Sequence, residues 1–136
     1  MKQHSKNALY LAERFKEIGL KYNYPGMTTH PQHELMKSMM NEEFGFGGMI
    51  AIDMETAERA ATLMESMQLK NVGYHAVSLG YFKTLFSNSG KSTSSEVPEN
   101  VQNEMGMSPG LVRFSVGLDN DIEATFQLIK ECLDVL

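Results

Sequence analysis

The 136-residue sequence has one cysteine, no tryptophan and no apolar run long enough to span a bilayer. The single thiol, Cys132, cannot form an intramolecular disulfide. Charged residues interrupt the first twenty positions, where a secretory signal would need a continuous apolar stretch. These absences argue against a membrane or secreted protein, and we expect a cytoplasmic location with a reducing environment.

Basic residues are also few. Lys and Arg number 12 against 17 Asp and Glu, which gives a net charge of −5. Because nonspecific binding to nucleic acids depends on clustered positive charge, no nucleic-acid partner is expected. Methionine, in contrast, occurs 11 times, and its flexible thioether side chain suits either an adaptable core or a contact surface.

Alternating helical and strand patterns predict one domain over residues 1–136, with no internal repeat and no linker. Apolar residues recur with helical spacing over 8–18, 31–41, 54–67, 98–105 and 122–133, and strand patterns cover 21–24, 49–52, 72–77 and 111–116. The predicted fold class is therefore α+β, an α/β sandwich with a sheet of about four strands and helices mainly on one face.

Several local features refine this prediction. A capping box at Thr29 and Gln32 predicts the start of the second helix, whose inner side would carry Leu35, Met36, Met39 and Met40. The strand over 49–52 is apolar on both faces, which predicts a central strand covered on both sides. The stretch from Ser87 to Ser95 is rich in serine and is predicted to be a loop.

Arg113 is the most informative single residue. Period-two alternation over 111–116 places Val112 and Phe114 on one face of a strand and Arg113 on the other, with Ser115. A guanidinium presents a planar set of donors that matches a carboxylate bidentately. From spacing alone, however, a solvated or salt-bridged structural arginine is the favoured interpretation.

Other candidates carry weaker signals. Ser78, Leu79 and Gly80 follow a predicted strand, where hydroxyl and backbone N–H groups become free to meet a ligand. His30 and His33 share a helical face, but the sequence specifies no third ligand, so no metal site is predicted. Cys132 has no histidine near it in the sequence and is expected to fill core space.

Six short segments, in order along the chain, carry a family resemblance. They are H-S-K-N-A at 4–8, Y-P-G at 24–26, H-P-Q-H-E-L at 30–35, F-G-G-M-I at 46–50, A-V-S-L-G at 76–80 and G-L-V-R-F-S-V-G-L-D at 110–119. Together they resemble the C-terminal domain of the pyridoxal-phosphate-dependent Cys/Met metabolism enzymes. That family includes cystathionine γ-synthase, the cystathionine lyases, methionine γ-lyase and O-acetylhomoserine sulfhydrylase.

The resemblance implies the small domain of a fold-type I enzyme, with a largely antiparallel sheet, acting in transsulfuration as a lyase or transferase. It implies that Arg113 holds the α-carboxylate of the amino-acid substrate, a homoserine, cysteine or methionine derivative. Ser78, with Leu79 beside it, would assist at the same carboxylate. The serine-rich stretch beginning at Ser87 stands where the family usually has H-P-x-x-M-T-H.

The resemblance also implies that this chain lacks the family's cofactor-binding lysine. Pyridoxal phosphate requires a lysine for its covalent attachment, and none of the lysines here lies in the family's S-x-T-K context. The large cofactor-binding domain is therefore expected to be absent, no cofactor is expected to attach covalently to this chain, and the chain alone is expected to be inactive. A separate large domain or a second copy of the chain is a possible partner. A stand-alone amino-acid-binding or interaction module without catalysis is the alternative.

Overall fold

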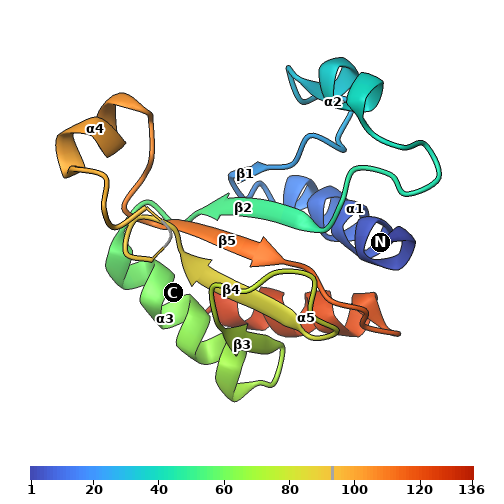
Figure 1. Ribbon diagram of the computed structural model, residues 1–136. Coiled ribbons are helices and arrows are strands. Elements are labelled where there is room, and N and C mark those ends of the chain that lie inside the picture. The colour runs from blue at the N-terminus through green and yellow to red at the C-terminus, as the bar shows by residue number, and fades with distance from the viewer. Residues whose placement is uncertain (93) are drawn as a thin grey trace.

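The computed structural model describes residues 1–92 and 94–136. Helices and strands alternate along most of the chain (Figure 1). They are α1 (Lys2–Glu17), β1 (Tyr22–Asn23), α2 (His33–Met39), β2 (Met49–Asp53), α3 (Ala57–Leu69), β3 (Gly73–His75), β4 (Thr84–Asn88), α4 (Glu99–Glu104), β5 (Leu111–Ser115) and α5 (Ile122–Leu133).

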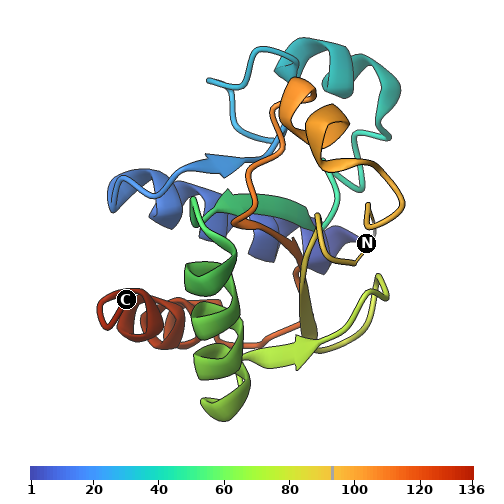
Figure 2. The ribbon, with the colours of Figure 1, turned by 90° about the vertical axis from the view of Figure 1, so that its left-hand side faces the viewer.

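One five-stranded sheet organises the molecule, with strand order β1-β2-β5-β4-β3. All neighbours are antiparallel except β3 and β4, which run parallel. Helices α1, α3 and α5 cover one face of this sheet, whereas α2 and α4 stand apart from that layer (Figure 2). The predicted α+β class, the largely antiparallel sheet and the one-sided helical cover are confirmed.

The core lies between the sheet and the three covering helices. Phe114 of β5 contacts Phe15 of α1 and Phe86 of β4, with ring centroids 6.2 and 6.0 Å apart. Phe126 of α5 completes the cluster at 6.3 Å from Phe15. Burying these rings on one side of β5 fixes the register of that strand, because a one-residue slip would turn every side chain to the opposite face.

Some local predictions were wrong. A fifth strand, β4, takes in Ser87 and Asn88, which were assigned to a loop; its five residues are all buried and show no alternation that would reveal a strand. The second helix begins at His33 after Gln32, with no side-chain cap from Thr29. Strand β2 is covered on one face only, since Ile50 and Ile52 are buried and Met49 is exposed.

The methionine side of α2 does not face the core. Leu35 and Met39 are 55% and 67% exposed, and His33 is the buried residue of this helix. The apolar periodicity correctly marks a helix, but it cannot say what covers the apolar side. No helix among the described residues combines the length and hydrophobicity needed to cross a membrane.

Polar side chains of α1 fasten the segment that leaves β5. Asn7 Nδ2 donates to the carbonyl oxygens of Gly117 and Asp119 at 3.0 and 3.1 Å. The ring nitrogen Nδ1 of His4 lies 2.7 Å from the Val116 carbonyl oxygen. Both side chains are buried, so α1 holds the C-terminal end of β5 through hydrogen bonds as well as apolar packing.

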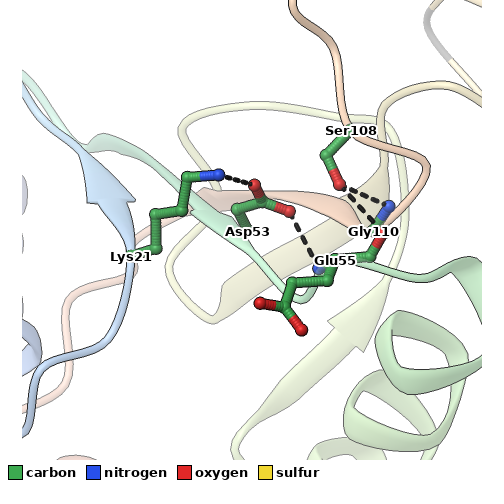
Figure 3. A network of polar contacts seen from close by, with 5 residues as sticks. All are labelled: Lys21, Asp53, Glu55, Ser108 and Gly110. Carbon is green, nitrogen blue, oxygen red and sulfur yellow. Dashed lines mark hydrogen bonds and ion pairs between the residues drawn. The ribbon is translucent and has the colours of Figure 1, made fainter.

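A second polar network fastens the other end of β5 (Figure 3). Asp53, the last residue of β2, accepts hydrogen bonds from Lys21 Nζ at 2.5 Å and from the Glu55 backbone at 2.8 Å. The Ser108 hydroxyl donates to the Glu55 carbonyl oxygen and accepts from the Gly110 N–H. Strand β5 is therefore anchored at both ends, which gives its side chains fixed positions.

Candidate functional site

Arg113 lies in the middle of the sheet, on the face that α1, α3 and α5 leave uncovered. Its neighbours in sequence, Val112 and Phe114, are fully buried against the helices. Across the ladders, Arg113 is paired with Ala51 of β2 and with Ser87 of β4. The predicted alternation along β5 is confirmed, and it places the guanidinium opposite the core.

Backbone oxygens, rather than an acidic side chain, hold the guanidinium. Nη2 of Arg113 donates to the Val77 carbonyl oxygen at 2.8 Å and approaches the Ser78 carbonyl oxygen at 3.5 Å, the limit of a hydrogen bond. Over residues 1–92 and 94–136, no carboxylate forms an ion pair with Arg113. The cation is anchored, but its charge is not neutralised.

The segment that receives Arg113 is itself tied to the sheet at two points. The Ala76 N–H donates to the Phe86 carbonyl oxygen at 3.1 Å, and the Gly80 N–H donates to the Ser115 hydroxyl, also at 3.1 Å. Gly80 has a φ of +67°, a conformation that glycine adopts without strain. Ser78 and Leu79, between these anchors, are exposed. Neither the Ser78 hydroxyl nor the Leu79 N–H has a hydrogen-bond partner in the described part of the chain.

A hollow of about 260 Å³ flanks this segment. Its lining includes Leu79 and Gly80, His4 of α1 and Ser115 of β5. Neither Arg113 nor Ser78 is one of the lining residues. The arrangement brings together the three residues predicted from the sequence, Arg113, Ser78 and Leu79, around one accessible stretch of the open face.

Sequence reasoning did not find the supporting residues of this site. Val77 contributes through its carbonyl oxygen, which no side-chain pattern can reveal. Ser115 was placed on the Arg113 face, but nothing in the sequence showed that it holds Gly80. Ser87 was hidden because β4 was not recognised as a strand.

The two histidines considered as metal ligands have separate partners. His30 Nε2 lies 2.9 Å from Asn23 Oδ1, and its Nδ1 accepts from the Gln32 N–H. His33 Nδ1 lies 2.8 Å from the Pro25 carbonyl oxygen, and its ring stacks on Phe46 at 4.8 Å. No group of three potential metal ligands occurs within the described residues.

Comparison with known proteins decides the family. Residues 1–131 match the family described as Cys/Met metabolism PLP-dependent enzyme. The chain belongs to this family.

Individual relatives of this Cys/Met metabolism chain support the same family. It is 50% identical over 124 residues to methionine γ-lyase of Arabidopsis thaliana, covering 90% of this chain and 28% of that protein. It is 35% identical over 111 residues to cystathionine γ-lyase of Bacillus subtilis, covering 82% of this chain and 27% of the relative. The chain thus spans less than a third of the length of these relatives.

A solved structure shows the same fold. A putative O-acetylhomoserine (thiol)-lyase from Campylobacter jejuni superposes with a TM-score of 0.84 at 23% identity, over 97% of this chain and 31% of that one. Its description records a pyridoxyl-lysine monophosphate, in keeping with the cofactor dependence of the family.

The lysines of this Cys/Met metabolism chain do not fit the covalent anchor of that cofactor. Such an anchor requires a lysine amine with a lowered pKa in a sheltered site. None of the lysine residues is buried, and four are paired with carboxylates: Lys2 with Glu43, Lys21 with Asp53, Lys70 with Glu131 and Lys130 with Asp134. The ion pairs of Lys21 and Lys70 raise their pKa, which is the opposite of what the anchor needs.

Proposed function

We propose that this chain supplies the substrate α-carboxylate site of a pyridoxal-phosphate-dependent enzyme of sulfur amino-acid metabolism. Arg113 binds the carboxylate, and the Ser78 hydroxyl and Leu79 N–H add hydrogen bonds to it. The observation that carries the proposal is a guanidinium fixed by the Val77 carbonyl oxygen and free of any acidic partner over the described residues.

The donors left on Arg113 suit this role. A guanidinium carries five N–H donors, and the Nη2 contacts with the Val77 and Ser78 carbonyl oxygens leave Nη1 without a described partner. Nη2 has a second hydrogen besides the one bonded to Val77, and its 3.5 Å contact with Ser78 is weak enough to be replaced. A carboxylate that accepts from Nη1 and from this Nη2 hydrogen would be held in one plane, which fixes the orientation of the Cα atom bonded to it. Orientation of that kind is the contribution that a carboxylate site makes to chemistry at Cα.

Membership of the family supports a class of substrate. We propose an amino acid of the homoserine, cysteine or methionine group, handled by C–S bond cleavage or γ-replacement in the assembled enzyme. The reactive lysine would lie outside these 136 residues, so the 136 residues alone would cleave no C–S bond. The expectation that no cofactor attaches covalently to this chain stays a prediction.

A partner for the exposed surface beside the site completes the proposal. Val77, Leu79 and Phe82 are 58%, 58% and 60% exposed, next to the segment that holds Arg113. Exposed apolar side chains so close together in the sequence support contact with another protein. A large cofactor-binding domain, or a second copy of the chain, would cover this surface. We place the assembled enzyme in the cytoplasm.

Two titrations test the proposal. Addition of pyridoxal phosphate to the purified chain should give no stoichiometric lysine-linked absorption band; such a band would overturn the assignment of the anchor to another domain. Calorimetric titration with L-methionine should give weak, saturable binding in the native chain that is lost in Arg113→Ala. Equal heats in the two proteins would overturn the role of Arg113.

A further inference from the structure

Ser87 and Arg113 stand directly opposite each other in the β4–β5 ladder. Each has a buried polar atom without a hydrogen-bond partner in the described residues, Ser87 Oγ and Arg113 Nε. The third such atom in the described chain, Arg14 Nε, lies on a different element, α1. Two of the unpartnered buried atoms thus belong to one cross-strand pair.

The two groups are chemically complementary. The Nε–H of arginine can only donate, and a serine hydroxyl oxygen can accept. Directly opposite residues of an antiparallel pair have Cβ atoms about 4.5–5.5 Å apart on the same face of the sheet. Rotation of the serine about a single side-chain torsion moves Oγ between staggered positions. A buried polar group without a hydrogen-bond partner lowers the stability of the fold. A hydrogen bond between Ser87 Oγ and Arg113 Nε would satisfy two such groups at once.

We propose that Ser87 is a positioning residue for Arg113, with the Ser87 hydroxyl oxygen accepting the Arg113 Nε–H. The guanidinium is then held at two points, by Ser87 at Nε and by the Val77 carbonyl oxygen at Nη2. Two points fix the plane of the group and leave Nη1 available to donate to a ligand. The functional meaning of this bond rests on the proposed carboxylate site, whereas the bond itself does not.

Nuclear magnetic resonance of the nitrogen-15-labelled chain tests the bond directly. The sequence has three arginines, Arg14, Arg59 and Arg113, so each Nε–H signal can be assigned by a single Arg→Lys substitution. In Ser87→Ala the Arg113 Nε–H should exchange with water at least tenfold faster than in the native chain. The Arg14 Nε–H, also buried, should be unchanged and shows that the fold is intact.

A matched control separates this effect from general loosening. Ser5 is another buried serine, and its hydroxyl contacts the Phe44 carbonyl oxygen and the Gly47 N–H on a different part of the molecule. Ser5→Ala should leave the Arg113 Nε–H exchange unchanged. Identical Arg113 exchange in the native chain and Ser87→Ala would overturn the hydrogen bond, and so would an equal increase in Ser87→Ala and Ser5→Ala.

A binding measurement then tests the positioning role. L-Methionine affinity should fall about fivefold in Ser87→Ala, the loss expected for one supporting hydrogen bond. Equal affinity in the native chain and Ser87→Ala would overturn the positioning role. Absence of methionine binding in the native chain would instead overturn the carboxylate site, and the Nε–H exchange would still decide whether the bond exists.

Discussion

Arg113 Nη2 donates a hydrogen bond of 2.8 Å to the carbonyl oxygen of Val77, a residue 36 positions earlier in the chain. The contact joins the middle strand of the sheet to the segment that carries Ser78 and Leu79. Because a carbonyl oxygen bears no full charge, it orients the guanidinium without cancelling its positive charge. An acidic side chain in the same place would hold the cation equally well and would compete with a substrate carboxylate.

Ser115→Ala should loosen the segment opposite Arg113. The Ser115 hydroxyl accepts the Gly80 N–H at 3.1 Å, and alanine removes that acceptor. We expect a loss of about 1 kcal/mol in the free energy of unfolding and faster amide exchange at Gly80. Urea unfolding and amide exchange measure the two effects. Ser38→Ala, which removes an exposed hydroxyl on α2, is the control and should change neither. Unchanged exchange at Gly80 in Ser115→Ala would show that the serine does not hold the segment.

Gly117→Ala should destabilise the exit of β5. A Cβ atom at this position would lie 2.5 Å from the Phe82 carbonyl oxygen and 2.6 Å from the Thr84 nitrogen. Both are backbone atoms that cannot rotate away, so the strands must separate, at a cost of about 1–3 kcal/mol. Gly106→Ala is the comparison, because its added Cβ meets nothing within 4 Å and only its positive φ is strained. Equal losses for the two variants in urea unfolding would contradict this account of Gly117.

Asp53→Asn should weaken the anchor at the start of β5. The Asp53 side chain is 11% exposed and accepts bonds from Lys21 Nζ and the Glu55 N–H. We expect a loss of about 2 kcal/mol in the free energy of unfolding at neutral pH, since hydrogen bonds to a charged acceptor are the stronger kind. Lys21→Ala should cost less, because the lysine side chain is 76% exposed and the ion pair is screened by water.

The effect of Asp53→Asn should also depend on pH in one direction. Burial acts to raise the pKa of the Asp53 carboxyl, but the hydrogen bonds from Lys21 and from the Glu55 N–H, with the positive charge of Lys21, hold the pKa below its ordinary value. A lowered pKa in the folded state gives stability that is fully present above the unfolded-state pKa and is lost as pH falls through the folded-state pKa. The difference in unfolding free energy between the native chain and Asp53→Asn should therefore shrink as pH falls from the unfolded-state pKa of Asp53 through its folded-state pKa. A difference that grows with acidification would be inconsistent with a lowered pKa.

The sequence was sufficient for the fold class and for the face that Arg113 occupies, because both follow from periodicity. The alternation of Val112, Arg113 and Phe114 is a local pattern, and the core enforces it. The sequence was not sufficient to predict β4, because that strand is buried on both faces and shows no alternation. It was also not sufficient to predict that the apolar side of α2 is exposed. Whether an apolar side is covered depends on tertiary packing, and the Val77 carbonyl contact depends on a backbone path that side-chain patterns do not encode.

Comparison of L-methionine with L-methioninamide, in the native chain and in Arg113→Ala, tests the central claim most directly. The amide keeps the amino group and the side chain but has no carboxylate, so only contacts with that charge are lost. If Arg113 binds the carboxylate, the native chain should bind methionine at least tenfold more tightly than methioninamide, and Arg113→Ala should bind both equally. A preference for methionine that is the same in the native chain and in Arg113→Ala would contradict the claim, and so would equal affinities for the two ligands in the native chain.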